Sequence, residues 1–487
     1  MSESAQRDPA ATYDVIVIGA GVVGAAIARE LSRYRVRCAL VEAASDVGTG
    51  TSKANTAILH TGFDAKAGSL EARLVRRGHS LLRGYGTAAG IPIECSGALL
   101  IAWSAEQQAA LPAIIATAER NGYTAARHVS VEELYRAEPH LAPGALGAIK
   151  VPDESIICPF TTPLAYATQA VVNGVDLRLS SPVESIGRHA DGTHAVRTPR
   201  GTLHSRYVVN AAGLHADTID RWFGYSAFTV TPRRGELIVF DKLARPLVSR
   251  ILLQVPTAVS KGILISPTVF GNVMLGPTAE EVPDRRATGS TAEGTASLIE
   301  RGRRILPQLV DEEVTAVYVG LRAATEHSDY QIRFHPEQRY VCVGGIRSTG
   351  LSASMAIAEY VVEGLADAGL SLVPVDDFRT VRMPNIGEAF TRPYQSPDQI
   401  AADSNYGDII CHCEGVTRGE ILDSLRAVIP ARSLDGVRRR TRALLGRCQG
   451  FYCMAAVARL VADRNQQSIP SLLALDPDDV TPIGSHS

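Results

Sequence analysis

The feature that most constrains the fold lies near the start of the chain, where three glycines separate an apolar run from an amphipathic one. Gly19, Gly21 and Gly24 form G-x-G-x-x-G within YDVIVIGAGVVGAAIARELSRY, residues 13–34. This spacing is typical of the first strand, turn and helix of a dinucleotide-binding unit, whose glycines permit the tight turn, the approach of a pyrophosphate and close helix packing. Glu42 ends the next apolar run, where a carboxylate binds ribose hydroxyls. The sequence therefore predicts a Rossmann-like domain that holds a dinucleotide.

Three later segments bear on the choice between FAD and NAD, which the glycine motif alone leaves open. A polar loop, GTGTSKANTAILHTG, occupies residues 48–62, NAAG ends a later strand at 210–213, and GGIRSTGLSAS leads into a helix at 344–354. Together with the glycine motif they resemble the D-amino-acid-oxidase-like family of FAD enzymes, in order over residues 12–375. Within that family they are most similar to glycerol-3-phosphate and L-2-hydroxyglutarate dehydrogenases. The resemblance implies that FAD binds at Gly19, Gly21, Gly24, Glu42, Thr51, Ser52, Asn55, Val183, Ala212, Gly213, Gly350 and Leu351.

The resemblance also implies hydride transfer to flavin from a carbon that bears a hydroxyl or an amine. Such a reaction needs one group that holds the substrate's anion and another that accepts a proton. Arg322 and Arg347 stand at family-like places and are candidates for the anion, although either also suits a surface ion pair. His60 is the candidate general base or hydrogen-bonding partner, although a single histidine is commonly a core residue. Further candidates from the similarity to substrate-domain strands are Lys261, Thr268 and Asn272.

Half of the eight cysteines lie close together near the C-terminus and predict a metal site. ICHCEGVTRGE and GRCQGFYC give C-x-C, then 34 residues, then C-x4-C. Clustering in a chain without an expected export signal favours metal binding over disulfides. The tight C-x-C is unusual for zinc and differs from common ferredoxin patterns, which leaves the metal open at this point. The candidate ligands are Cys411, Cys413, Cys448 and Cys453, whereas Cys38, Cys95, Cys158 and Cys342 are expected as small core residues.

The C-terminal segment resembles the bacterioferritin-associated ferredoxin domain, whose four cysteines hold a [2Fe–2S] cluster. Thr417 and Glu420 form a capping-box pattern that predicts a helix after the first cysteine pair. Met454 and Ala455 depart from the family pattern, in which a small residue and a proline are expected after the last cysteine, but no ligand is lost. The neighbouring arginines either offset the cluster's negative charge or form a solvated helix face; they are Arg438, Arg439, Arg440, Arg442 and Arg447.

The order of these segments predicts an α/β (α+β) fold with a separate C-terminal unit. A Rossmann-like FAD-binding domain is expected to be interleaved with an antiparallel-sheet substrate domain, followed by a small helical [2Fe–2S] domain. We expect an oxidoreductase over 12–383, with FAD-binding parts at 12–90, 150–225 and 330–375 and substrate-domain parts at 91–149 and 226–329, a linker at 384–407, the [2Fe–2S] domain at 408–470 and a tail at 471–487.

The resemblance favours oxidation of sn-glycerol 3-phosphate to dihydroxyacetone phosphate, with electrons passed to a quinone or a partner redox protein and not to NAD. A similar C-terminal domain occurs in some glycerol-3-phosphate dehydrogenases, which favours this substrate. One alternative is a dehydrogenase or oxidase for L-2-hydroxyglutarate or another 2-hydroxy acid, which is also a small anion. Another is a subunit of an amino-acid dehydrogenase, or a flavoprotein subunit that relays electrons without a substrate. The cluster's role, redox or structural, stays open.

Composition excludes other classes of function. The net charge of −2 gives no general polyanion-binding surface, so no nucleic-acid partner is expected. The longest apolar run, residues 15–28, is too short and too rich in glycine to span a bilayer. The N-terminus lacks the basic and apolar regions of a secretory signal. We therefore expect a cytoplasmic protein, with peripheral contact at the inner face of the membrane and homo- or hetero-oligomers left open.

Overall fold

The computed structural model describes residues 12–256, 262–388 and 390–473, and the chain divides into two compact units between Phe390 and Thr391. The first unit contains two large sheets, and the second contains short helices around the cysteines. The α/β fold class with a helical C-terminal region is confirmed. The segment expected as a linker contains a short helix, α9 (Pro397–Ala402), and two 3-10 turns.

The sheet that carries the glycine motif is mixed. Strand β1 (Tyr13–Ile18) lies between β2 (Cys38–Val41) and β12 (Gly201–Asn210), and both neighbours run parallel to it. Ile18 is paired with Asn210, so the glycine turn and NAAG meet at the carboxyl edge of the sheet. Such an edge is where nucleotides bind in open α/β sheets. The remaining strands are β9 (Asp176–Arg178), β10 (Ser185–Arg188), β11 (His194–Thr198), β19 (Gln331–His335) and β20 (Tyr340–Gly344).

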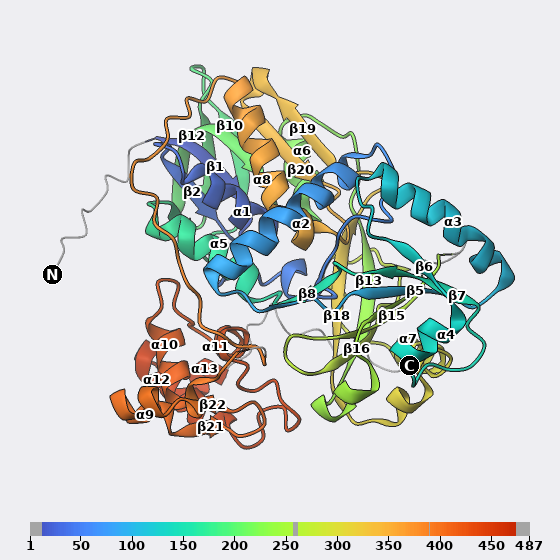
Figure 1. The fold of residues 1–487 in the computed structure, drawn as a ribbon. Coiled ribbons are helices and arrows are strands. Elements are labelled where there is room, and N and C mark those ends of the chain that lie inside the picture. Colours follow the sequence, from blue (N-terminus) through green and yellow to red (C-terminus); the bar gives the residue numbers. More distant parts are fainter. Residues whose placement is uncertain (1–11, 257–261, 389, 474–487) are drawn as a thin grey trace, which may run out of the picture. The chain divides into compact units, whose positions relative to one another are not determined.

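Helices cover one face of this sheet (Figure 1). Helix α1 (Val22–Leu31) packs between α5 (Thr161–Val172) and α8 (Gly350–Asp367). Helix α2 (Leu70–Ala89) packs on α8 and begins at a Ser69 cap. Because a Cβ at Gly78 would lie 2.2 Å from the backbone oxygen of Ser352, only glycine allows the two helices to approach this closely. This packing fixes the first turn of α8.

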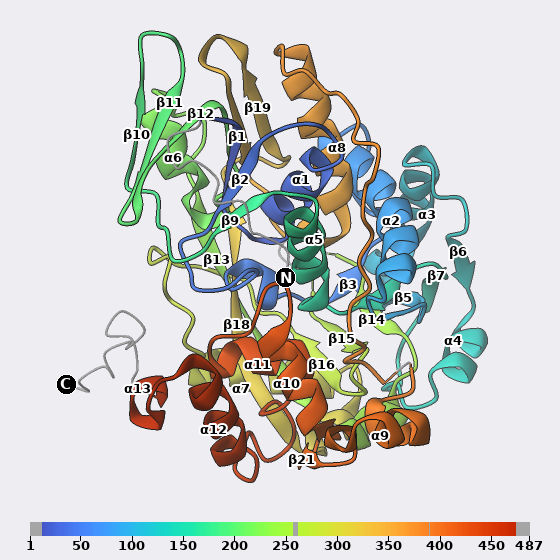
Figure 2. The same cartoon turned by 90° about the vertical axis from the view of Figure 1, so that its left-hand side faces the viewer.

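The second sheet is largely antiparallel, as expected, with one parallel pair. Its longest strands, β13 (Thr231–Phe240) and β18 (Val314–Ala324), run side by side (Figure 2). They pair along their length, and Arg233 lies opposite Arg322. The parallel pair joins residues 98–101 to residues 251–254. The other strands are β5 (Ala98–Ala102), β6 (Arg127–Val129), β7 (Gly147–Val151), β14 (Ile251–Gln254), β15 (Leu264–Pro267), β16 (Val273–Gly276) and β17 (Glu280–Glu281).

A small antiparallel sheet positions the polar loop and its histidine. It consists of β3 (Ile58–Leu59), β8 (Ser155–Ile157) and β4 (Ile93–Glu94), with β8 in the middle. Leu59 is paired with Ser155, so the residues that follow β3 and precede β8 are neighbours. These residues are His60 and Glu154, and the short sheet therefore brings an acid and a base together.

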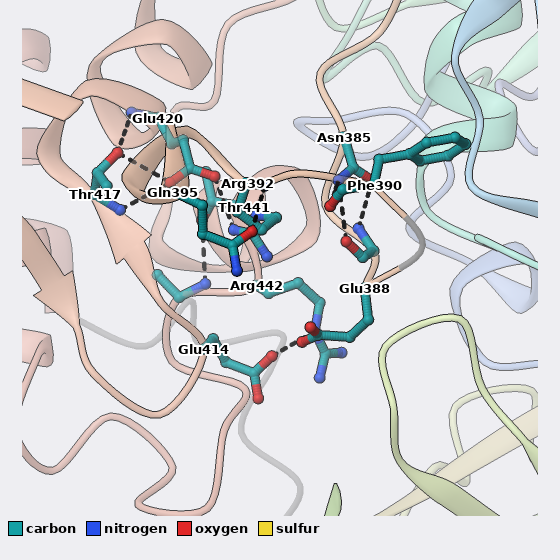
Figure 3. Close-up of polar contacts among 12 residues, drawn as sticks. Asn385, Glu388, Phe390, Arg392, Gln395, Glu414, Thr417, Glu420, Thr441 and Arg442 are labelled. Carbon is teal, nitrogen blue, oxygen red and sulfur yellow. Dashed lines mark hydrogen bonds and ion pairs between the residues drawn. The ribbon is translucent and has the colours of Figure 1, made fainter. Parts of the chain in front are cut away.

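The second unit is built around its own apolar core. Its main helices, α10 (Arg418–Arg426), α11 (Leu434–Thr441) and α12 (Met454–Asn465), enclose Val416, Ile421 and Val437. Thr417 and Glu420 form the predicted capping box, in which each side chain binds the other residue's backbone amide. Figure 3 shows this cap together with Arg392, whose Nη2 donates to Glu420 at 2.7 Å.

Two expectations need correction. Cys95 is exposed, whereas Cys38, Cys158 and Cys342 are buried as expected. A solvated helix face is wrong for Arg439, Arg440 and Arg442, which are all buried.

No helix in the described part of the chain is long and apolar enough to cross a membrane.

Candidate active site

The glycine turn leaves no room for side chains at two of its three positions. Gly19 has φ +101°, and a Cβ there would lie 2.6 Å from the backbone oxygen of Ala211. A Cβ at Gly24 would lie 1.9 Å from the backbone oxygen of Gly19. The backbone of the turn is therefore not covered by side chains of its own at Gly19 and Gly24, just before and within the start of α1. Such a turn lets a pyrophosphate approach the backbone N–H groups at a helix N-terminus.

Gly24→Ala is expected to abolish FAD binding and to lower the thermal midpoint, because the added methyl group meets a backbone oxygen that cannot move without opening the turn. The ratio of flavin to protein absorbance in the purified protein measures this effect. Gly84→Ala is the matched control, since no atom lies within 4 Å of a Cβ at this position of α2. The control should keep its flavin and become slightly more stable. Full flavin content in Gly24→Ala would contradict the prediction.

Glu42 lies beside the glycine turn, as the spacing predicted for a ribose-binding carboxylate. Its Oε2 accepts from the Ala20 amide at 2.7 Å, and its Oε1 accepts from the Ala44 amide at 2.9 Å. Burial raises the pKa of Glu42, and the hydrogen bonds from these amides oppose that rise. Ser52 Oγ accepts from the Val22 amide at 2.9 Å and so ties the polar loop to the start of α1.

The polar loop also contacts the strand that carries Arg322. Thr51 Oγ1 donates to the Leu321 oxygen at 2.8 Å, and the Tyr318 hydroxyl donates to the Asn55 oxygen at 2.7 Å. Asn55 closes the loop on itself, since its Nδ2 donates to Ser52 O and its Oδ1 accepts from the Ala57 amide. Residues expected to bind FAD therefore lie next to the strand expected to hold the substrate.

The remaining expected cofactor residues have different surroundings. Ala212 and Gly213 directly follow the Ala211 that contacts the glycine turn, whereas Val183 packs against the apolar core of the first sheet. Gly350 and Leu351 begin α8, where a Cβ on Gly350 would lie 3.9 Å from the Val23 side chain of α1. The two helix N-termini and the NAAG segment thus meet, although their residues are more than 100 positions apart in the sequence.

His60 forms an acid–base pair with Glu154. The His60 Nδ1 lies 3.0 Å from Glu154 Oε2, and the backbone amide of His60 donates to Ser352 Oγ at 2.8 Å. Glu154 is fully buried, and its Oε1 accepts from both the amide and the hydroxyl of Thr61. Burial alone would raise the pKa of Glu154, but His60 and the Thr61 donors outweigh burial and leave it below its ordinary value.

An ionised Glu154 fixes the tautomer of His60. A carboxylate only accepts hydrogen bonds, so Nδ1 must carry the proton and Nε2 carries the lone pair of the neutral ring. This arrangement gives His60 the chemistry of a general base at Nε2. Glu154 was missed by sequence reasoning; the available indication was a pair of adjacent acids, Asp153 and Glu154, directly before the apolar run SIIC and 94 positions from His60.

Arg322 is a largely desolvated cation with few polar partners. Its Nη2 donates to the Thr278 oxygen at 2.6 Å, and no described residue forms an ion pair with it. Burial, assisted by the charge of Arg233, lowers the pKa of Arg322 to about 10. Arg322 therefore stays charged at neutral pH while lacking a counter-anion, which suits a site for an anionic substrate.

Arg347 has a carboxylate partner. Its Nη2 donates to Glu71 Oε2 at 2.6 Å and to the Ser328 oxygen at 2.7 Å. Thr349 Oγ1 donates to the other oxygen of Glu71. Arg347 thus joins the loop before α8 to the first turn of α2. Its guanidinium already binds a carboxylate, so a bound substrate would have to share it with Glu71.

The further substrate-domain candidates occupy a hairpin turn. Thr268 and Asn272 close the connection between β15 and β16, where the Thr268 amide donates to the Asn272 oxygen at 2.9 Å. Asn272 Nδ2 also donates to the Phe240 oxygen at 3.0 Å. Both residues are buried, and these bonds stabilise the turn. Lys261 lies outside the described residues.

The four cysteines in the second unit form two pairs of thiols. Cys411 is hydrogen-bonded to Cys453, and Cys413 to Cys448. In the first pair, the bond to Cys453 lowers the pKa of Cys411 to about 6. In the second, amides led by that of Tyr452 lower the pKa of Cys448. No group of three or more His, Cys, Asp or Glu side chains in the described residues forms a site for one metal ion.

This pairing fits the [2Fe–2S] cluster, because each of its two irons takes two thiolates, whereas zinc needs four ligands around one point. Backbone amides of Glu414, Leu444 and Gly450 also donate to the sulfurs and would stabilise their negative charge. The cluster, when bound, supplies a one-electron carrier. Cys411 and Cys453 are buried and the other pair is partly exposed.

Two buried arginines make local contacts in the second unit. Arg442 Nε donates to Glu414 Oε2 at 3.1 Å, next to Cys413 (Figure 3). Arg440 donates to the oxygens of Ile429 and Gly436. These contacts stabilise the second unit, and the one made by Arg442 reaches the residue next to Cys413.

Comparisons with known proteins agree with this geometry. A model of the FAD-dependent oxidoreductase family matches residues 14–364, and a model of the BFD-like [2Fe–2S] binding domain matches 409–463. A glycerol 3-phosphate dehydrogenase of Caloramator mitchellensis is 35% identical over 92% of this chain and 94% of its own. One of the subunits of the anaerobic glycerol-3-phosphate dehydrogenase of Escherichia coli K12 is 25% identical over 92% of this chain and 88% of that subunit. The structure of L-α-glycerophosphate oxidase from Mycoplasma pneumoniae with FAD bound is 27% identical, with a TM-score of 0.73 over 77% of this chain and all of the other.

Proposed function

The chain belongs to the FAD-dependent oxidoreductase family, and on this basis we propose that it oxidises sn-glycerol 3-phosphate to dihydroxyacetone phosphate. FAD accepts a hydride in this chemistry, and the [2Fe–2S] cluster carries single electrons. The relatives described above act on glycerol 3-phosphate according to their names. Their similarity over most of this chain supports the proposal.

The observation that carries the proposal is Arg322, which is desolvated and has no ion-pair partner among the described residues. A guanidinium fork matches the oxygens of a phosphate, as it does those of a carboxylate, so Arg322 suits an anionic substrate, and the named relatives favour the phosphate. The strand with Arg322 contacts the polar loop that contains His60, at Thr51 and Asn55, and these contacts support a site that combines an anion-binding group with a base. We assign phosphate binding to Arg322 and removal of the hydroxyl proton at C2 to His60 Nε2.

The test is anaerobic mixing of the purified protein with glycerol 3-phosphate, L-2-hydroxyglutarate and a panel of amino and 2-hydroxy acids. Bleaching of the flavin absorbance by glycerol 3-phosphate, well before any other compound, is the expected result. Bleaching by L-2-hydroxyglutarate or by an amino acid would replace the proposed substrate with that compound. Bleaching by none would favour an electron-relay subunit over a dehydrogenase.

We also propose that electrons leave by way of the cluster to a quinone or a partner redox protein. Cys413→Ser should remove the cluster's visible absorbance and its EPR signal after reduction, since one iron loses a thiolate. Reduction of flavin by substrate should persist within about threefold, because that step belongs to the first unit. Turnover with an external one-electron acceptor should fall.

The exposed Cys95 provides the control for this experiment, because Cys95→Ser removes a thiol from the first unit and should change neither signal. Loss of the flavin in Cys413→Ser would contradict a purely electron-carrying cluster and indicate a structural one. Unchanged turnover with the acceptor would contradict the proposed exit route.

A further inference from the structure

A depression on the surface of the first unit carries positive charge that the proposed reaction does not use. Its volume is about 790 Å³, and the first turns of α2 line it together with the end of α3 (Ala105–Arg120). None of the lining residues is acidic, and neither His60 nor Arg322 is among them. Its four arginines are Arg73, Arg76, Arg77 and Arg120.

Two of these arginines are held by aromatic rings. The guanidinium carbon of Arg73 lies 5.1 Å from the ring centre of Tyr360, and that of Arg76 lies 5.4 Å from the ring centre of Tyr123. No described residue forms an ion pair with Arg73 or Arg76. A guanidinium that stacks on a ring keeps the N–H groups of its edge available to an anion.

The other two arginines leave the depression positively charged. Arg77 donates through Nε and Nη2 to Glu359, at 3.0 Å each. Arg120 Nη2 donates to Thr117 Oγ1 at 2.9 Å. Arg77 is thus offset by Glu359, and the positive charge of the depression comes mainly from Arg73, Arg76 and Arg120, whose mutual repulsion a bound anion would relieve.

The helix N-terminus at this place is already satisfied. Asp329 accepts from the amides of Leu70 and Glu71 at 2.7 and 2.9 Å, and Ser69 caps the Ala72 amide. Because Asp329 and Ser69 already accept from these amides, an anion in the depression would bind the arginine side chains. Asn121 adds rigidity, because its Nδ2 donates to the backbone oxygens of residues 62 and 65 in the loop after His60.

We propose that this depression binds a phosphate-bearing anion, either the headgroup of an anionic lipid or a free phosphate compound. Guanidinium forks match the geometry of phosphate oxygens. The volume exceeds that of a single inorganic ion and suits a phosphate with an organic part. The site is separate from the substrate residues, so the proposal goes beyond the proposed function.

The experiment compares the full-length, flavin-loaded protein with R73Q/R76Q, using two probes. Sedimentation with vesicles of phosphatidylcholine containing one quarter phosphatidylglycerol tests the lipid source, and calorimetric titration with inorganic pyrophosphate tests the free source. At least one probe should bind the wild type, with about tenfold weaker binding to the variant. Vesicle binding identifies the lipid headgroup, and pyrophosphate binding alone identifies the free compound.

The control R136Q/R304Q removes the same charge from exposed arginines that are ion-paired within their own helices. It should bind each probe as the wild type does. R120Q, at an exposed residue with one side-chain contact, serves as a second variant if R73Q/R76Q loses its flavin or its thermal midpoint. Binding of neither probe, or binding that is equal in the wild type and the depression variants, would overturn the proposal. Flavin bleaching by glycerol 3-phosphate is measured in parallel, so that failure of the proposed function is seen separately.

Discussion

Arg322→Gln is expected to lower kcat/KM for glycerol 3-phosphate by about 10²–10³-fold, mainly through KM. The side chain is a desolvated cation whose pKa burial lowers to about 10, so it gains most from an anion that shares its environment. Loss of one partner of a buried charge pair costs about 3–5 kcal/mol, and each 1.4 kcal/mol is a factor of ten. Because Arg322 is only partly buried, the lower part of this range applies. Steady-state kinetics over a wide range of substrate concentrations measures both parameters.

Two further variants separate charge from geometry. Arg322→Lys keeps the charge but lacks the planar fork, and an intermediate loss of about tenfold is expected. Arg233→Gln removes the cross-strand neighbour, whose guanidinium binds Glu281 at 2.7 Å near the surface, and kcat/KM should stay within about twofold.

Stability distinguishes a binding defect from misfolding. Since Arg322 is largely desolvated and has no carboxylate partner in the described structure, Arg322→Gln should be at least as stable as the wild type when no substrate is present. An unchanged KM in this variant would show that the phosphate is held elsewhere and would remove the main support for the proposed substrate.

The parts of the fold that sequence could predict are those encoded within short segments. The strand, glycine turn and helix over residues 13–34 and the capping box at Thr417 each depend on neighbours a few positions away. The meeting of the glycine turn with NAAG was also predictable, because parallel strands place their carboxyl ends at one edge. Local chemistry fixes the first two, and the rule for parallel strands fixes the third.

The site's acid–base pairing could not be predicted, because it depends on contacts across the chain. Glu154 meets His60 only through the three-stranded sheet, and Glu71 meets Arg347 across 276 positions. Neither partner has a spacing that sequence periodicity detects. Cys95 was misjudged for the same reason, since an apolar neighbourhood in sequence does not fix burial in space.

Glu154→Gln is expected to lower kcat by about 10²–10⁴-fold while KM changes little, because Glu154 acts through His60 and does not hold the substrate. Glutamine retains the size of the side chain but lacks the negative charge that stabilises a protonated ring, and its amide also permits the wrong tautomer. The acid limb of the pH profile of kcat/KM should move to lower pH, since that charge favours the protonated form of the base. A merely structural role would not move this limb.

Stability against acid gives an independent check on the same carboxylate. The pKa of Glu154 in the folded protein lies below its unfolded value of 4.5, so ionised Glu154 stabilises the fold above that pH. This stabilisation disappears as the pH falls through the folded-state pKa. Glu154→Gln should therefore be less stable than the wild type at neutral pH, with a difference that shrinks on acidification, measured by urea unfolding at several pH values.

The pair is tested directly by a double-mutant cycle with His60→Gln. If Glu154 acts only through His60, the double variant should lose no more activity than His60→Gln alone. Glu138→Gln is the matched control, because this carboxylate is also buried but binds Arg250 and Ser249, which lie outside the flavin loop. Its stability should fall without a change in the pH profile. Losses that multiply in the double variant would show that the two residues act independently, and His60 would then need no orienting carboxylate.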